Sequence, residues 1–124
     1  MTTLHELEAV LVDRRDGDAP EGSYSVTLVH DAERAQRKIM EEAFELCREL
    51  ERRSADAAVA PLRTVEEAAD LLFHVVAGLV GARVPVTDVL AELDRRGGRA
   101  AGAGRAAGGQ GAGGQGALGG GDPS

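Results

Sequence analysis

The sequence predicts an all-α protein, a small bundle of about four helices. Apolar residues recur at intervals of three and four along several segments of the 124-residue chain, which is typical of amphipathic helices. Only "SYSVTLV" (residues 23–29) is β-branched and partly alternating. A single strand has nothing to pair with, so we expect this segment to be an extended, ordered loop.

The first two predicted helices flank the break "DGDAPEG". Thr3 and Glu6 have the spacing of a capping box, which predicts a helix over residues 3–15. The second helix begins at about Asp31, a suitable N-cap, and continues to about Arg53. Its predicted apolar stripe consists of Ala35, Ile39, Ala43, Leu46 and Leu50, with Cys47 beside it.

Two further helices are predicted after the linker "SADAAVAPLR". Thr64 and Glu67 form a second possible capping box, which opens a helix that reaches about Ala82. From Leu71 onward this helix is apolar on nearly every side, apart from one histidine, so it needs neighbours all around it. A shorter helix follows in "VPVTDVLAELDRR", with Thr87 as its predicted cap.

The chain is small and has few aromatic residues for a core. It contains two Phe, one Tyr and no Trp, and a domain of this size is marginally stable alone. We therefore expect an oligomer. Beyond residue 98 the composition changes to Gly, Ala, Gln and Arg, so we expect residues 1–98 to form one all-α domain and residues 99–124 a disordered tail.

Charge and cysteine content exclude several classes of function. The net charge of −7, from 21 acidic and 14 basic residues, indicates no nucleic-acid partner. The single cysteine, Cys47, excludes an internal disulfide, and we expect it to be a small buried hydrophobe. The most apolar stretch is interrupted by His74, Arg83 and Pro85 before it reaches a membrane-spanning length. We expect a soluble, cytoplasmic protein with no membrane partner.

Acidic residues border the apolar stripes of the two central helices. On a helical wheel, Lys38, Glu42, Glu45 and Glu49 fall within an arc of about 60°, next to the apolar stripe. On the next helix, Glu67, Asp70 and His74 form a second narrow stripe. Carboxylates at this density beside apolar surface have to be protonated, paired with bases or bound to cations.

The carboxylates form two pairs, ExxE (Glu42 and Glu45) and ExxD (Glu67 and Asp70). If the two helices pack antiparallel, these pairs face one another. Oxygen ligands of this kind suit Mg²⁺ or Mn²⁺, which leave positions free for water and for substrate phosphates. The pattern therefore indicates a cation site for phosphate chemistry.

Simpler roles for the same residues stay open. Glu67 could be only the reciprocal arm of the Thr64 capping box. The glutamates of "KIMEEAFEL" could form a solvated face balanced by Lys38 and Arg48. For His74 we expect a hydrogen-bonding role rather than metal ligation, since it is the only histidine on its helix face.

Four motifs resemble the phosphoribosyl-ATP pyrophosphatase family. They are "PEGSYSVTL", "RKIMEEAFEL", "VEEAADLLFHVVAGL" and "VLAELDRRGG", in this order between Leu4 and Gly98. The ExxE and ExxD pairs alone would indicate the wider superfamily of all-α (MazG-like) nucleoside-triphosphate pyrophosphatases. The flanking "PEGSY" and "EAADLLFH" narrow the resemblance to this family.

The resemblance implies a homodimer formed through the central helices and a Mg²⁺-dependent enzyme of histidine biosynthesis. The reaction it implies is the second step of that pathway, hydrolysis of the nucleotide phosphoribosyl-ATP to phosphoribosyl-AMP and pyrophosphate. By motif match, the implied metal ligands are Glu42, Glu45, Glu67 and Asp70, with Glu41 as a further catalytic residue. The implied substrate-binding residues are Lys38, Arg34, Arg14, Ser23 and Tyr24.

Two alternatives share the carboxylates. One is a house-cleaning pyrophosphatase that acts on free nucleoside triphosphates and does not need the "PEGSY" segment. The other is a non-catalytic helical dimer that binds metal through the same residues. An assay of turnover separates both from the first hypothesis.

Overall fold

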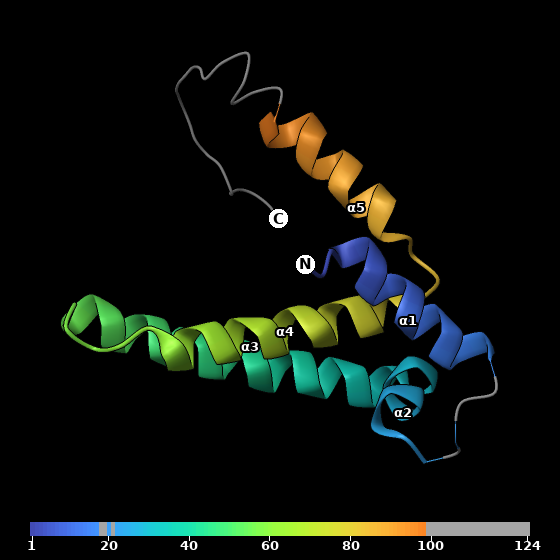
Figure 1. Cartoon of the computed structure of the whole chain (residues 1–124), viewed down its shortest axis with the longest axis horizontal. Coiled ribbons are helices and arrows are strands. Elements are labelled where there is room, and N and C mark those ends of the chain that lie inside the picture. Colours follow the sequence, from blue (N-terminus) through green and yellow to red (C-terminus); the bar gives the residue numbers. More distant parts are fainter. Residues whose placement is uncertain (18–19, 21, 99–124) are drawn as a thin grey trace. The chain divides into compact units, whose positions relative to one another are not determined.

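A computed structural model describes residues 1–17, 20 and 22–98 of the chain. Within this part the protein consists of α1 (Leu4–Asp16), α2 (Tyr24–His30), α3 (Ala32–Ala55), α4 (Leu62–Gly81), α5 (Val86–Leu93) and a π-helical turn, Asp94–Gly98 (Figure 1). The same part contains no strand, so the predicted all-α class is confirmed. The tail predicted at 99–124 lies outside the described residues.

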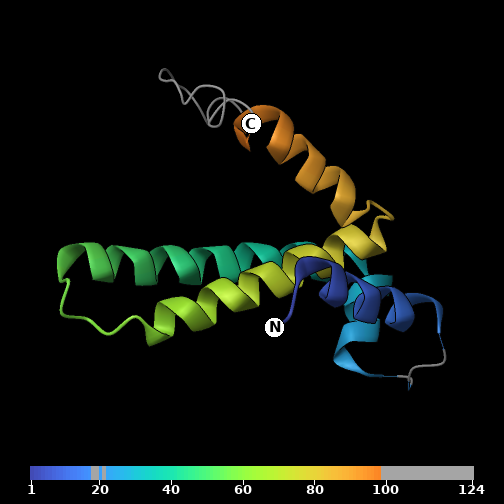
Figure 2. The same cartoon turned by 45° about the horizontal axis from the view of Figure 1, so that its top comes forward.

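The long helices α3 and α4 lie side by side in Figures 1 and 2 and run in opposite directions. Local signals determine where α3 begins: the Asp31 carboxylate accepts a hydrogen bond of 3.0 Å from the Arg34 N–H, as predicted. At their contact, Gly78 of α4 lies against Ala35 and Ile39 of α3. The predicted antiparallel pair is therefore present.

The start of α4 differs from the prediction. The helix begins at Leu62, directly after Pro61, and no side-chain cap is present there. Proline is favoured at helix starts because its φ angle is already helical and it has no N–H to satisfy. Thr64 consequently lies inside the helix, and the capping box with Glu67 is wrong.

The segment 23–29 was expected to be an extended loop, and this expectation is also wrong. Residues from Tyr24 onward form α2, and the Ser23 side chain accepts a hydrogen bond of 3.3 Å from the Val26 N–H. Leu28 and Val29 are only 1% and 4% exposed. The neighbouring helices bury these apolar side chains, and this tertiary burial outweighs the β preference of a short segment.

Helix α1 packs on α2 and α4. Its capping box is present as predicted, because Thr3 N–H donates to Glu6 Oε1 (2.8 Å) and Glu6 N–H donates to Thr3 Oγ1 (3.0 Å). At the other end of α1, Arg15 donates to the carbonyl oxygen of Val80 (2.8 Å). These contacts place the buried Leu11 in the core.

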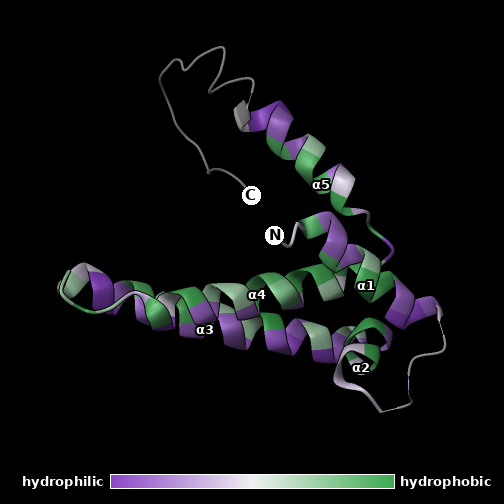
Figure 3. Cartoon of the chain, in the orientation of Figure 1, coloured by the Kyte–Doolittle hydropathy of each residue, from purple (hydrophilic) through white to green (hydrophobic). Residues whose placement is uncertain are grey.

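The buried core lies around the second half of α4, where Val76, Ala77 and Val80 are at most 3% exposed. Figure 3 shows α4 as mainly hydrophobic, while α3 alternates between polar and apolar segments. The first half of α4 is less covered: Leu62, Val65 and Leu72 are all at least half exposed. From Leu71 onward, where neighbours were expected on every side, Val76, Ala77 and Val80 are covered within the chain, whereas Leu72 is exposed.

On α3, too, part of the predicted apolar stripe is exposed. Ala35 is buried, but Leu50 is exposed. Cys47 is also exposed, which contradicts its expected burial. Both residues lie in the second half of α3, which runs alongside α4 in the described part of the chain (Figure 1).

Residues Met1–Val86 form one unit, and a second unit begins at Thr87. Helix α5 begins at Val86, whose N–H donates to Glu8 Oε2 (2.8 Å), so Thr87 lies within the helix and its predicted capping role is wrong. In the second unit, the Glu92 carboxylate accepts hydrogen bonds from Arg95 and Arg96. These bonds hold the pKa of Glu92 at about 2.

Within the described residues, no single helix has the length and apolar character needed to cross a membrane.

Candidate metal and nucleotide site

Three carboxylates from the two long helices converge. One oxygen from each of Glu42, Glu67 and Asp70 lies within 4.8 Å of the other two. Glu67 and Asp70 are three residues apart and therefore share a face of α4, and the antiparallel packing brings Glu42 of α3 to that face. Glu67 is buried, Glu42 is half-buried and Asp70 is exposed. We refer to these three residues as the carboxylate cluster.

The cluster carries more negative charge than its protein partners offset. Burial raises the pKa of Glu67 above its ordinary value, and the negative charges of Glu42 and Asp70 raise it further. Arg63 acts in the opposite direction, with its Nη2 3.1 Å from Glu67 Oε2. An all-oxygen group with this residual charge fits a hard divalent cation, so the cluster could hold a metal ion.

Lys38 lies beside the cluster and carries a stable positive charge. Its Nζ is 3.1 Å from Glu41 Oε1 and 3.6 Å from Glu42 Oε2. The hydrogen bond to Glu41 is the main reason that the pKa of Lys38 is raised. Glu41 is thus paired with Lys38 on the exposed side of α3 and is not one of the three clustered carboxylates.

Glu45, the second member of the predicted ExxE pair, is half-buried on α3. Among the described residues, it is not one of the three carboxylates that meet within 4.8 Å. The structure therefore brings together three of the four residues predicted as metal ligands.

His74 and Tyr24 connect α4 to the beginning of α2. His74 Nδ1 is 2.7 Å from the Asp70 carbonyl oxygen, and His74 Nε2 is 2.6 Å from the Tyr24 hydroxyl. A carbonyl oxygen can only accept, so Nδ1 carries the hydrogen. In the neutral ring Nε2 then accepts a hydrogen bond from the tyrosine hydroxyl. The hydrogen-bonding role predicted for His74 is confirmed.

The predicted substrate-binding residues divide into two groups. Tyr24, Arg34 and Lys38 lie near one another: the Arg34 guanidinium is 5.8 Å from the centre of the Tyr24 ring, and Lys38 is one helical turn from Arg34. Ser23 instead caps α2. Arg14 forms an ion pair with Asp13 (3.6 Å) on α1.

Two residues beside these stripes were not predicted as part of the site. Arg63 forms an i,i+4 ion pair with Glu67, a spacing that the sequence already contains. Glu49 lies on the arc of Lys38 and Glu42 and is only 7% exposed, with Arg52 Nη1 at 3.6 Å. The arc indicated that Glu49 borders the core, but its degree of burial depends on packing against other elements.

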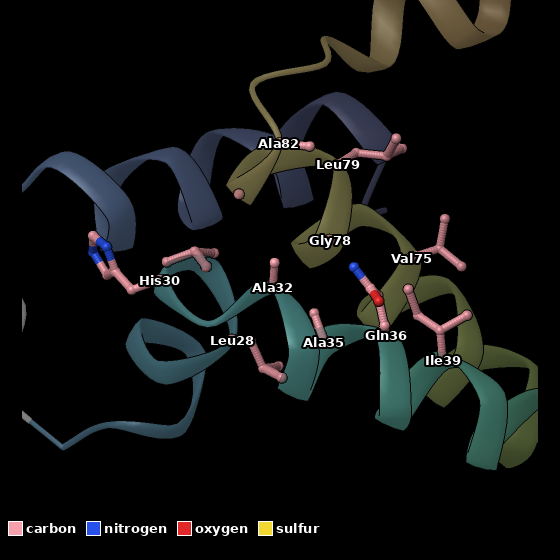
Figure 4. Close-up of a pocket in the computed structure, with 12 residues that line it drawn as sticks. Leu28, His30, Ala32, Ala35, Gln36, Ile39, Val75, Gly78, Leu79 and Ala82 are labelled. Carbon is pink, nitrogen blue, oxygen red and sulfur yellow. The ribbon is translucent and has the colours of Figure 1, made fainter.

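A separate pocket of about 410 Å³ opens between α2, α3 and α4 (Figure 4). Small residues leave this space free, among them Ala32, Ala35 and Gly78. Its polar lining side chains are His30 and Gln36, and it contains no carboxylate. The pocket is therefore distinct from the carboxylate cluster.

Comparison with known proteins shows the family to which this sequence is similar. Residues 4–97 match the family phosphoribosyl-ATP pyrophosphohydrolase. The phosphoribosyl-ATP pyrophosphatase of Rhizorhabdus wittichii is 41% identical over 107 residues, 84% of this chain and 92% of that protein. The enzyme of the same name from Agrobacterium fabrum is 39% identical with the same coverage of both chains.

A longer relative contains a similar segment. The histidine biosynthesis bifunctional protein his7 of Schizosaccharomyces pombe is 37% identical over 91 residues, 73% of this chain. This chain spans only 19% of that protein's length. No solved structure matches this chain significantly. The match over residues 4–97 includes all three members of the carboxylate cluster, and the chain belongs to the phosphoribosyl-ATP pyrophosphohydrolase family.

Proposed function

We propose that this protein hydrolyses phosphoribosyl-ATP to phosphoribosyl-AMP and pyrophosphate, the second step of histidine biosynthesis. The observation that carries the proposal is the carboxylate cluster, formed by two antiparallel helices inside the family-matched residues 4–97. The names of the bacterial relatives, each covered over 92% of its length, support the choice of substrate. Because the proposed substrate is a phosphorylated metabolite made and used inside cells, we place the enzyme in the cytoplasm.

Mg²⁺, or Mn²⁺ in its place, is the cation that we propose for the cluster, with Glu42, Glu67 and Asp70 as ligands. Glu45 is retained as a candidate fourth ligand because of the motif match alone. A bound divalent cation would neutralise charge on the pyrophosphate leaving group and lower the pKa of a coordinated water.

The remaining residues bind and orient the substrate in this proposal. Lys38 and Arg34 supply positive charge for phosphate oxygens, and Glu41 keeps Lys38 in place through their hydrogen bond. Water is added across the anhydride between the α and β phosphates, so one fragment leaves as pyrophosphate and the other as phosphoribosyl-AMP. The protein contributes chiefly by positioning the phosphates and stabilising charge.

We further propose that the enzyme is a homodimer whose central helices pair. The support is a set of exposed apolar side chains on the two long helices: Met40, Phe44, Leu50, Leu62, Val65 and Leu72. A second copy of the chain would cover apolar side chains that the single chain leaves exposed. Sedimentation analysis at micromolar concentration tests this point, and a particle with the mass of one chain would contradict it.

The experiment for the main proposal measures pyrophosphate release from phosphoribosyl-ATP in Mg²⁺, with Glu42→Gln as the test variant and the exposed Glu51→Gln on the same helix as the control. We expect Glu42→Gln to lower kcat by about 100-fold or more while helicity and melting temperature are retained. Glu51→Gln should behave like the wild type. Release only from a panel of common nucleoside triphosphates would favour the house-cleaning alternative, and full turnover by Glu42→Gln would remove the cluster from the mechanism.

A further inference from the structure

We propose that Tyr24 and His74 form a positioning pair, which ties the beginning of α2 to the Asp70 turn of α4 and thereby holds Tyr24 and Arg34 for substrate binding. The inference rests on the proposed function, since it concerns the same site. Tyr24 was predicted to contact substrate, and His74 to form hydrogen bonds. Their direct contact, fifty positions apart in the chain, adds a specific role for both.

The His74 ring is held on several sides. Nδ1 donates to the Asp70 carbonyl oxygen (2.7 Å), and Nε2 accepts from the Tyr24 hydroxyl (2.6 Å). The rings of Phe73 and Tyr24 meet it edge to face, with centroids 5.2 and 5.8 Å away. With the residue only 6% exposed, the imidazole has little freedom to rotate. It is therefore a rigid support for the tyrosine.

The hydrogen bonds that hold Tyr24 connect it, through His74, to a residue of the carboxylate cluster. Asp70 contributes its side chain to the cluster, and its backbone carbonyl receives the histidine hydrogen bond. Through His74, the Tyr24 hydroxyl is thus held at a fixed position relative to the turn of α4 that carries the proposed metal ligand Asp70. A change in this hydrogen-bond chain should alter where the substrate groups lie relative to the cluster.

The other side of Tyr24 faces the proposed phosphate-binding residues. The residue is 43% exposed although its hydroxyl is bonded inward. The Arg34 guanidinium lies 5.8 Å from the ring centre, within the range of a cation–π contact. Lys38 follows one turn later on α3. Fixing Tyr24 therefore also limits where Arg34 can go, and this predicts an effect on substrate binding more than on the chemical step.

The two histidine nitrogens can be tested separately. Gln places an amide oxygen near the position of Nε2 and can still accept from Tyr24, whereas Asn places an amide N–H near Nδ1 and can only keep the bond to Asp70. In the proposed reaction, we expect Tyr24→Phe and His74→Asn each to raise KM about 5- to 10-fold, the effect of one lost hydrogen bond. We expect kcat to change less than about 2-fold, and His74→Gln to keep KM near the wild-type value.

A double variant and a matched control complete the experiment. Tyr24→Phe combined with His74→Asn should raise KM no further than either change alone, because both remove the same contact. The control is Thr27→Val, which removes a different hydrogen bond of α2, from the Thr27 hydroxyl to the Ser23 carbonyl oxygen (3.2 Å). It should lower the melting temperature without raising KM.

The possible results separate this inference from the proposed function. A wild-type protein that does not release pyrophosphate from phosphoribosyl-ATP would refute the function. Normal wild-type turnover with an unchanged KM in Tyr24→Phe would refute only the positioning pair. Equal KM values in His74→Gln and His74→Asn, or a KM increase in Thr27→Val as large as that in Tyr24→Phe, would also overturn it, since either result indicates general loosening of the structure.

Discussion

Two glycines of α4 provide a matched test of how closely the helices pack. Gly78→Ala and Gly81→Ala add the same methyl group to the same helix, and Ala is favoured over Gly in a helix interior by about 1 kcal/mol. They differ in what the methyl group meets. At position 78 it would lie 3.2 Å from Ile39 Cδ1, and at position 81 it would lie 3.0 Å from the carbonyl oxygen of Val29.

The expected stability changes have opposite signs. Ile39 Cδ1 is the end of a flexible side chain beside the open pocket of Figure 4 and can move by a few tenths of an ångström. Gly78→Ala should therefore stabilise the protein by about 0.5–1 kcal/mol. The Val29 carbonyl is backbone of α2 and cannot move alone. Overpacking costs about 1–3 kcal/mol, and the propensity gain is smaller at Gly81, the last residue of α4.

We therefore expect Gly81→Ala to destabilise the protein by about 1 kcal/mol, which is a fall in Tm of about 4–8 °C for a domain of this size. A displaced α2 should also move Tyr24 away from His74, so KM should rise as in Tyr24→Phe. Thermal unfolding followed by circular dichroism, together with steady-state kinetics, measures both effects. The reasoning is refuted if the two variants have the same Tm, or if Gly81→Ala is the more stable one.

Two further predictions concern single polar side chains on α4. The Thr64 hydroxyl is buried and has no hydrogen-bond partner among the described residues, so Thr64→Val should stabilise the protein by about 1 kcal/mol in denaturant titrations. Thr64→Ser, which keeps the hydroxyl, should bring no such gain. The pKa of Glu67 is raised above 4.5 by burial, so the folded metal-free protein keeps this proton to higher pH than the unfolded chain, and stability falls as pH rises through that interval. In EDTA, the Tm difference between Glu67→Gln and wild type should therefore grow from about pH 4 to about pH 7. Mg²⁺ should raise the wild-type Tm more at the higher pH. A Tm difference between the two proteins that does not change with pH would contradict this account.

Helix signals that act within a few residues could be predicted from the sequence. The capping box of Thr3 and Glu6, the Asp31 cap and the apolar periodicity of α3 and α4 all depend on neighbours three or four positions away. One further prediction, that Glu42 faces Glu67 and Asp70, needed the additional assumption that consecutive long helices pack antiparallel. The structure has this arrangement.

The local structure was predicted less well where the sequence pattern was compatible with more than one conformation. The β-branched residues 23–29 suggested extended backbone, yet burial of Leu28 and Val29 against other helices favours α2. Thr64 and Glu67 have capping-box spacing, yet Pro61 starts the helix three residues earlier. In both segments the local pattern was compatible with more than one structure. Burial against other helices decided for residues 23–29, and the neighbouring Pro61 decided for the start of α4.

The sequence by itself determined the helical class, the approximate extents of α1, α3 and α4 and the identity of the carboxylates, because these follow from the 3.6-residue period and from motif spacing. Only the tertiary structure decided which groups meet. It brought Glu42 to Glu67 and Asp70 while leaving Glu45 outside that group, and it joined Tyr24 to His74 across fifty positions. Such contacts depend on the angle and the distance at which two helices pack. This angle and distance result from the packing of many side chains that are far apart in the sequence.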